Sequence, residues 1–439
     1  MAEGPRPIET DLPERPGPLA GPVSLLSILL LTLAVAAAMG AGRLWPVLYR
    51  AYVSVPVLPL ALLAAAVVLG VLGPARMRRW AFNLCLSALL TAIYLSATVP
   101  PLGDHDLWLR IAQQDHATVA ELLANVTYRL ARLLHVHPYL VPPAFGFLAA
   151  LAYLTTVDEV LADRPKVQRP RAKALCSVLY IASGVQAVFF RGYVENTQLA
   201  VPFLLTAICL LLRYVRRSGA GLDLMIIPGA GVMTLAALFH GQDAFLLPGL
   251  LFAAAVRRLP ARECKGLAGD VLLAGLTVAV VGGGTLDAVR AAGFVTATGN
   301  VHWQPGSMFV ALWRPLAAQD DFTMFSFDHL LQVANIVAVV FPAFPLAAIT
   351  LVALPARSTS KPESLLAVLA LGYLAFAFLW NFSLGFPNDY DLMISLSTPL
   401  VLFLSACTVR LSQFAPKAAW AMVAVNLAYS WATICLLLR

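Results

Sequence analysis

The sequence predicts an all-α membrane protein, a polytopic bundle of about thirteen transmembrane helices. Of its 439 residues, 60% are hydrophobic and only 12% are charged, whereas a soluble globular domain is about half apolar and a quarter charged. The apolar residues occur in runs of about 20, the length that a helix needs to cross roughly 30 Å of hydrocarbon. Lipid offers the backbone no hydrogen-bond partner, so each run is expected to form a helix.

A short tail precedes the apolar runs. Residues 1–21 are rich in proline and mixed in charge. They lack the basic start and the small-residue cleavage site of a signal peptide, so a disordered cytoplasmic tail is predicted. The eighth run is short and contains Pro248, which predicts a tilted or re-entrant segment. The thirteen predicted spans are 22–42, 52–73, 80–98, 138–157, 174–190, 196–212, 222–239, 244–256, 267–289, 330–354, 363–382, 391–409 and 418–437.

The basic residues predict the orientation of these spans. If the N-terminus is cytoplasmic, 21 of the 30 Lys and Arg residues fall on the cytoplasmic side, as the positive-inside rule requires. The net charge of +7 therefore reports topology and does not indicate a nucleic-acid partner. The C-terminus is then extracytoplasmic, and a bacterial plasma membrane is the expected location. Beyond the tail, the cytoplasmic basic residues lie within 76–79, 164–173, 213–217, 257–265, 357–361 and 410–417.

The same map places two long loops, residues 99–137 and 290–329, on the extracytoplasmic side. In the first loop, apolar residues recur at helical spacing from Val119 to Leu134, with charged residues between them. This pattern predicts an amphipathic helix that lies in the membrane interface.

All seven histidines and five polar clusters also fall on the extracytoplasmic side. Charged groups at span ends are costly unless they are paired or face water, so they are candidates for function. The alternative is that they only pair with one another and cap helices. The clusters are Asp104-His105-Asp106 with Arg110; Arg191, Tyr193, Glu195 and Asn196; His240, Gln242 and Asp243; His302 and Trp303 with Asp328 and His329; and Asn388, Asp389, Tyr390 and Asp391.

These residue types suit chemistry at a phosphate group. A carboxylate can act as a general base, and Arg and His stabilise charge on a departing phosphate. Asp104 and Asp106 can also hold a divalent cation through their oxygens, and no other cofactor is indicated. The six cysteines form no CxxC pair, which argues against a zinc site or a disulfide framework. The absence of GxxxxGK[ST], HExxH and GxSxG motifs argues against a nucleotide-driven pump, a zinc metalloprotease and a serine hydrolase of that fold.

The layout and several short motifs resemble the GT-C superfamily of integral-membrane glycosyltransferases, particularly little-characterised bacterial members. The motifs are Leu102-Gly103-Asp104, Gly192-Tyr193-Val194-Glu195-Asn196, His329-Leu330-Leu331 and Asp389-Tyr390-Asp391-Leu392. On this mapping, 22–79 are two additional N-terminal spans, 80–329 form the core with both long loops, and 330–439 form the C-terminal spans. The chain departs from the class at Asp-His-Asp, where adjacent carboxylates are common.

The resemblance implies transfer of a sugar from a polyprenyl-phosphate donor to an acceptor on the extracytoplasmic face. The partners would be this lipid-linked donor and membrane lipids. Asp104 would be the base, and Asp106 its support or a metal ligand. Arg110, Arg191 and His240 would bind the donor phosphate. The expected substrate-binding residues are Tyr193, Glu195, Asn196, Gln242, Asp243, His302, Trp303, His329, Asp389 and Asp391.

Two other functions remain open from the sequence. A transporter or lipid flippase would use polar groups and broken helices near the midplane of the membrane. Gly282-Gly283-Gly284 and Pro248 are candidate breaks of this kind. A non-catalytic membrane scaffold subunit would keep the same fold without using the polar clusters.

Overall fold

A computed structural model describes residues 57–75, 77–96, 119–135, 141–183, 196–217, 222–291, 312, 323–345, 347, 360–380 and 393–437. These residues form thirteen α-helices and three 3-10 helices and contain no β-strand, which confirms the all-α class. The α-helices are α3 (Val57–Leu72), α4 (Arg79–Ser96), α6 (Val119–Leu133), α7 (Val141–Val160), α8 (Arg169–Ile181), α10 (Asn196–Arg216), α11 (Ile226–Phe239), α12 (Pro248–Arg258), α13 (Cys264–Ala291), α14 (Phe327–Val340), α16 (Lys361–Leu379), α17 (Met393–Phe414) and α18 (Pro416–Leu437). The 3-10 helices are η2 (Gly73–Ala75), η4 (Gly241–Leu246) and η5 (Leu259–Ala261).

Every predicted span from residue 52 onward overlaps one of these helices, although α8 and α14 cover only part of 174–190 and 330–354, and α6 matches the predicted amphipathic helix. Three helical segments, Leu199–Arg216, Cys264–Ala288 and Lys361–Leu379, are long and apolar enough to cross a membrane. This supports a membrane protein with transmembrane helices. The predicted tail and the first span, 22–42, lie outside the described residues.

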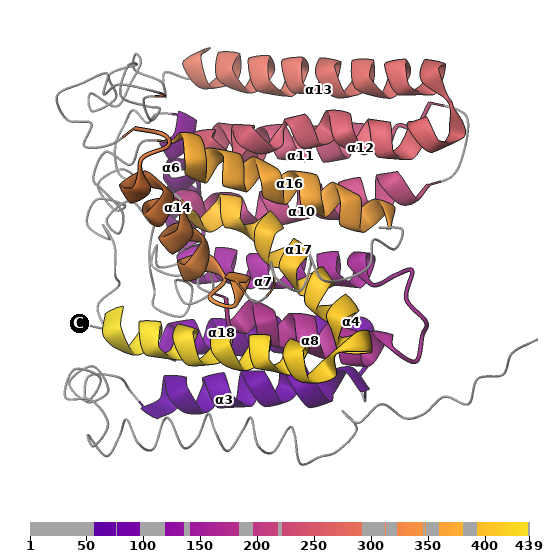
Figure 1. Ribbon diagram of the computed structural model, residues 1–439. Helices are drawn as coiled ribbons and strands as arrows, with labels where there is room; N and C mark the ends of the chain where they lie inside the picture. The colour runs from indigo at the N-terminus through magenta and orange to yellow at the C-terminus, as the bar shows by residue number, and fades with distance from the viewer. Residues whose placement is uncertain are drawn as a thin grey trace, which may run out of the picture.

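The long helices lie side by side along one common direction, with α13 at one edge of the bundle and α3 at the opposite edge (Figure 1). Helix α10 packs against α7, α11, α12 and α17 and forms the centre. Helix α13 packs mainly on α11 and α12. Its side chains Leu272, Leu276 and Val280 are 62%, 53% and 70% exposed. An apolar flank of this kind is expected where a helix faces lipid.

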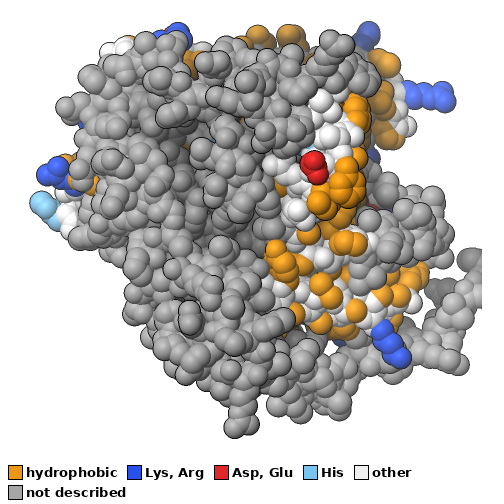
Figure 2. All heavy atoms as spheres, turned by 60° about the vertical axis from the view of Figure 1, so that its left-hand side comes forward, with side chains coloured by type: hydrophobic (Ala, Val, Ile, Leu, Met, Phe, Trp, Pro, Cys, Tyr) orange, Lys and Arg blue, Asp and Glu red, His pale blue; other side chains and the backbone are white. Residues whose placement is uncertain are grey.

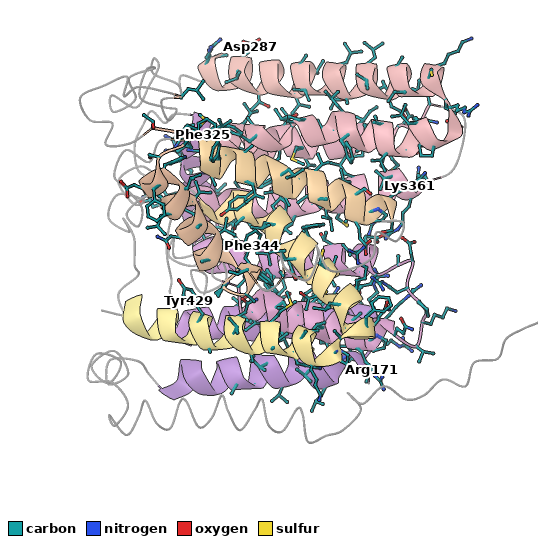
Figure 3. The ribbon with its side chains drawn as sticks, viewed as in Figure 1. Arg171, Asp287, Phe325, Phe344, Lys361 and Tyr429 are labelled. Atoms are coloured by element: carbon teal, nitrogen blue, oxygen red, sulfur yellow. The ribbon has the colours of Figure 1, made fainter. Side chains whose placement is uncertain are left out.

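The two ends of the bundle differ in composition. Arg171 and Lys361 lie at one end, here named the basic end, whereas Asp287 and Phe325 lie at the other, here named the polar-loop end (Figure 3). The predicted topology places Arg171 and Lys361 in cytoplasmic loops, Phe325 in an extracytoplasmic loop and Asp287 near the extracytoplasmic end of the ninth span, so this grouping agrees with helices that alternate in direction. Hydrophobic side chains cover much of the described surface on the right of Figure 2, with an acidic side chain among them.

One predicted irregularity is wrong, and the other takes a different form. Helix α13 runs without a break from Cys264 to Ala291, straight through Gly282-Gly283-Gly284. Glycine weakens a helix partly by exposing its backbone to water. Water is absent from hydrocarbon, so three glycines destabilise a helix less there than in a soluble protein. Pro248 is the first residue of α12 and does not interrupt it; proline is favoured there because that N–H has no helical partner. The eighth span is instead formed by η4 followed by α12.

Single cysteines should report which end faces the cytoplasm. With the native cysteines replaced, cysteines near Asp106, Gly299 and Asn388 are expected to react with a membrane-impermeant maleimide added to intact cells. Cysteines near Lys166 and Arg217 are expected to react only after the membrane is opened, because the basic loops stay on the cytoplasmic side. Labelling of the positions near Lys166 and Arg217 in intact cells would show that the predicted topology is inverted.

Candidate functional site

His240 and Asp243 form a buried pair where α11 turns into η4. Helix α11 ends as His240 adopts an extended backbone (φ −141°, ψ 99°), and the Asp243 N–H donates to the His240 carbonyl at 2.9 Å. This turn brings His240 Nδ1 to 3.3 Å from Asp243 Oδ1. The two residues are only 5% and 0% exposed. Two members of one predicted cluster are therefore in contact, and Asp243 can orient the imidazole through Nδ1.

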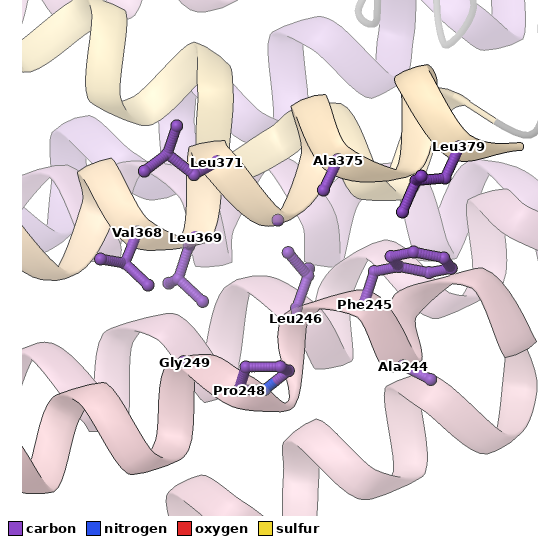
Figure 4. Close-up of a pocket in the computed structure, with 11 residues that line it drawn as sticks. Ala244, Phe245, Leu246, Pro248, Gly249, Val368, Leu369, Leu371, Ala375 and Leu379 are labelled. Carbon is purple, nitrogen blue, oxygen red and sulfur yellow. The ribbon is translucent and has the colours of Figure 1, made fainter. Parts of the chain in front are cut away.

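An apolar groove of about 560 Å³ begins beside this pair and runs between η4, α12 and α16 (Figure 4). Asp243 directly precedes two of the residues that line it. Leu246 from η4 and Leu369 from α16 point into the space from opposite sides. None of the lining side chains is polar. They are Ala244, Phe245, Leu246, Pro248, Gly249, Val368, Leu369, Leu371, Gly372, Ala375 and Leu379.

Two glycines set how closely the walls of the groove approach. A Cβ atom at Gly372 would lie 2.8 Å from the backbone oxygen of Phe245, and one at Gly249 would overlap the side chain of Leu369. Real Cβ atoms are not found this close to backbone atoms, so Gly372 is required for the observed contact between α16 and η4. These two glycines therefore allow η4 and α12 to approach α16 closely.

His329 belongs to a second predicted cluster and lies near the same end of α16. Ser326 caps α14 by accepting a hydrogen bond from the His329 N–H. The imidazole is buried, with Nε2 2.8 Å from the carbonyl oxygen of Phe378 and the two rings 5.5 Å apart. The observed contacts tie α14 to α16, and the predicted role of His329 in substrate binding stays a prediction. Asp328 is exposed beside it.

Only some of the other predicted site residues lie within the described part of the chain. Asn196 is the first residue of α10, and Gln242 is half-buried in η4 beside the pair. Of the predicted base and phosphate-binding residues, the structure describes only His240. The predicted residues that lie outside the described part are Asp104, Asp106, Arg110, Arg191, Tyr193, Glu195, His302, Trp303, Asp389 and Asp391.

No metal centre is visible in the part of the chain that the structure describes. No group of three or more His, Cys, Asp and Glu side chains there is arranged to hold an ion. The predicted ligands Asp104 and Asp106 lie beyond that part. A divalent cation at the acidic motif therefore remains a prediction.

At the basic end, several of the arginines and lysines that predict the topology also form buried ion pairs. Arg258 is fully buried, with Nε 2.6 Å from Asp270 Oδ2 and Nη1 2.6 Å from Glu263 Oε2. The Tyr214 hydroxyl also donates to Asp270, and Arg257 Nη1 lies 2.7 Å from Asp223 Oδ2. Hydrogen bonding to Asp270 raises the pKa of Arg258, which follows the predicted eighth span, 244–256. We name these residues the Arg258–Asp270 cluster.

A second buried cluster joins α4, α7 and α8. Lys173 Nζ lies 2.9 Å from Asp158 Oδ1 and donates to Asn83 Oδ1 at 2.6 Å. Arg79 Nε lies 2.6 Å from the other oxygen of Asp158. Burial lowers the pKa of Lys173, which precedes the predicted fifth span, while Asp158 opposes this shift. We name it the Lys173–Asp158 cluster.

A third set of contacts connects α16 to its neighbours. Glu363 lies 3.4 Å from Arg164 Nη2 and 3.7 Å from Arg410 Nη1. The three clusters together join most helices at the basic end. The sequence signal that could have found them is the position of their carboxylates, which lie inside or close beside the basic stretches.

Comparison with known proteins finds no matching family model, no similar curated protein and no similar solved structure.

Proposed function

We propose that the chain transfers a sugar from a polyprenyl-phosphate donor to an acceptor hydroxyl on the extracytoplasmic side of the membrane. The observation that supports this best is the buried His240–Asp243 pair at the start of an apolar groove. A lipid-linked donor has both an isoprenoid chain and a charged phosphate, and it reaches its enzyme through the bilayer. Such a donor needs no nucleotide-binding loop, in agreement with the absence of that motif.

The proposed reaction is an inverting displacement at the anomeric carbon. The acceptor oxygen forms a bond to that carbon as the bond to the phosphate oxygen breaks, and the bonding electrons leave with the phosphate. Asp104 takes the proton of the acceptor hydroxyl, and Asp106 supports it or binds a cation. His240, oriented by Asp243, donates a hydrogen bond to the phosphate oxygens, and Arg110 and Arg191 add positive charge.

The membrane arrangement proposed with this function is a bundle of thirteen spans. The N-terminus is cytoplasmic and the C-terminus extracytoplasmic in a bacterial plasma membrane. The core, 80–329, follows the GT-C layout. The polar-loop end of the bundle is then the extracytoplasmic end, and the donor phosphate and acceptor meet there.

A transporter or lipid flippase is the second candidate, and the basic end disfavours it. Alternating access would have to separate helices at both ends of the bundle. Opening the basic end would have to separate buried ion pairs that hold neighbouring helices together. The Arg258–Asp270 and Lys173–Asp158 clusters together hold several such pairs. A scaffold subunit would tolerate these clusters, so only an activity measurement separates a scaffold from the enzyme.

Membrane vesicles that contain the protein and its native acceptors provide that measurement. Radiolabelled polyprenyl phosphates that carry hexoses, pentoses or amino sugars are supplied, and release of free polyprenyl phosphate is followed. His240→Gln is expected to lower the rate about 10²-fold or more, because loss of a donor to the developing charge costs about 10²–10³. The matched control is His135→Gln, because His135 is exposed and belongs to no observed pair. Its rate should not change.

Two outcomes contradict the proposal. If wild-type vesicles release no polyprenyl phosphate from any donor above vesicles without the protein, the chain is not this enzyme and the scaffold is favoured. If His240→Gln turns over like His135→Gln, the His240–Asp243 pair is not part of the donor site.

A further inference from the structure

The segment that joins α7 to α8 and the turn that joins α17 to α18 meet at the basic end. The Gln413 side-chain amide donates to the side-chain oxygen of Gln168 at 2.9 Å and connects the two segments. Arg169 fixes the first segment by donating to the carbonyl oxygens of Ala162 and Arg164, at 2.6 and 2.8 Å. The two segments therefore form one defined surface at the start of α8. We name residues 165–171 and 413–417 the α8 corner.

Three cations on the α8 corner are exposed, namely Lys166, Arg171 and Lys417. Within the described part of the chain, none of them forms an ion pair with a carboxylate. Asp163, an exposed carboxylate in the same connecting segment, is already paired with Arg216 at 3.0 Å. Arg171 and Lys417 also lie in the first turns of α8 and α18, which contain no acidic residue. Cations are unfavourable there because a helix N-terminus has a partial positive charge, so this surface would gain from an external anion.

Apolar side chains are exposed among and beside these cations. Val167 is 81% exposed and Phe414 is 54% exposed. Helix α8 packs against α3, η2, α17 and α18, and Figure 1 shows α3, α8 and α18 together along one side of the bundle. The last residue of α3, Leu72, is 53% exposed, and Trp80 near the start of α4 is 63% exposed. Side chains of this kind suit the boundary between lipid head groups and acyl chains, where tryptophan is also enriched.

The combination of charge and apolar surface favours a lipid over other anions. The positive-inside rule explains cations in cytoplasmic loops, but it does not explain apolar side chains exposed between them. A free phosphate ion would neutralise the cations and leave Val167 and Phe414 in water. A soluble acidic protein would approach from the cytoplasm and would not cover Leu72 on the side of the bundle. A phospholipid with a negative head group offers an anion and hydrocarbon together.

We infer that the α8 corner binds the head group of an anionic phospholipid in the membrane leaflet at the basic end. Lys166, Arg171 and Lys417 contact its phosphate group, and Val167 and Phe414 enter the boundary beside its acyl chains. Arg171 lies at the basic end in Figure 3, which the predicted topology makes cytoplasmic. The inference concerns the opposite end of the bundle from the proposed sugar transfer and does not depend on it.

A fluorescent probe at residue 167 tests which lipid occupies the α8 corner. Val167→Cys, in the full chain with the native cysteines replaced, is labelled with NBD and reconstituted in phosphatidylcholine nanodiscs. Phosphatidylglycerol with a spin label on its acyl chain should quench the probe and saturate at a low mole fraction. Spin-labelled phosphatidylcholine should quench only in proportion to its share of the lipid. Soluble glycerol phosphate, which has the anion without acyl chains, should not compete, and high salt should weaken the selective quenching.

A matched pair of double variants tests the cations. Arg171→Gln combined with Lys417→Gln should raise the half-saturating fraction of phosphatidylglycerol roughly 25-fold, because each cation near an anionic surface contributes about fivefold to binding. The control is Arg132→Gln combined with Arg290→Gln, which changes the net charge equally. Both control residues are exposed, and they lie on α6 and at the last turn of α13, at the polar-loop end (Figure 1). Their replacement should leave the half-saturating fraction unchanged. Size-exclusion profiles establish that each variant is folded.

Native mass spectrometry of the chain with its cysteines intact provides a second measurement. The wild-type protein should retain phosphatidylglycerol in preference to phosphatidylcholine, and the Arg171→Gln, Lys417→Gln variant should lose this preference. Equal quenching by the two lipids, or equal half-saturation in both double variants, would overturn the inference. Quenching by neither lipid would favour a soluble acidic partner, and competition by glycerol phosphate would favour a free anion; either result would also overturn it.

Discussion

Replacing Asp270 with alanine is expected to destabilise the folded protein by about 3–5 kcal/mol, the largest stability effect of any single change considered for this chain. Asp270 is fully buried. It accepts hydrogen bonds from Arg258 Nε and from the Tyr214 hydroxyl. Removing the carboxylate leaves the buried guanidinium of Arg258 with Glu263 as its remaining anion, and Arg257 also loses a nearby negative charge.

The control for this change lies on the same helix. Asp287 is also paired with an arginine, but the two side chains are 4.0 Å apart, and they are 81% and 68% exposed. Asp287→Ala should change stability by no more than about 0.5 kcal/mol. SDS titration in mixed micelles, followed by tryptophan fluorescence, gives both values.

A double variant tests the assigned cause. Arg258→Met combined with Asp270→Leu replaces the pair by apolar groups, and buried ion pairs replaced in this way often retain or gain stability. The double variant should therefore be more stable than Asp270→Ala. If Asp270→Ala and Asp287→Ala unfold at the same SDS fraction, the buried pair does not stabilise the bundle.

The helices could be predicted from the sequence because their signals are local. Each apolar run predicted from residue 52 onward overlaps a helix, and helical spacing of apolar residues identified α6. The predicted break at Gly282-Gly283-Gly284 was wrong because helix propensities are measured in water. The packing of α13 against α11 and α12 could not be predicted, since it depends on how separate helices fit together.

Less of the site than of the helices could be predicted, because only part of it depends on residues that are close in the sequence. His240 and Asp243 are three residues apart, so a single turn places them in contact and their proximity could be inferred from sequence. The contact between Gly372 and Phe245 joins distant parts of the chain, and the groove depends on it. No short motif encodes such a contact. The Arg258–Asp270 pair was missed because the positive-inside rule already accounted for its basic residues, so the acidic residues beside them were not considered as partners.

Asp104→Asn is expected to have the largest effect on activity. In the proposed reaction Asp104 removes the proton of the acceptor hydroxyl, and loss of a general base costs on the order of 10²–10⁴ in rate. Asparagine keeps the size of the side chain but cannot take the proton. The rate of polyprenyl phosphate release should therefore fall by that factor, while protein yield and SDS resistance stay unchanged. The radiolabelled donor assay in membrane vesicles measures the rate.

Asp106→Asn and Asp287→Asn are the comparisons for Asp104→Asn. Asp106 is one residue away from the proposed base, so it separates proton removal from support. If Asp106 only orients Asp104 or binds a cation, Asp106→Asn should lower the rate less than Asp104→Asn, and added divalent cation should restore part of any loss that comes from weaker metal binding. Asp287 is an exposed carboxylate at the same end of the bundle, and its replacement should leave the rate unchanged.

Near-normal turnover in Asp104→Asn together with loss in Asp106→Asn would transfer the role of base to Asp106. Near-normal turnover in both would remove the acidic motif from the mechanism, because no base would then remain at the position where the resemblance places it.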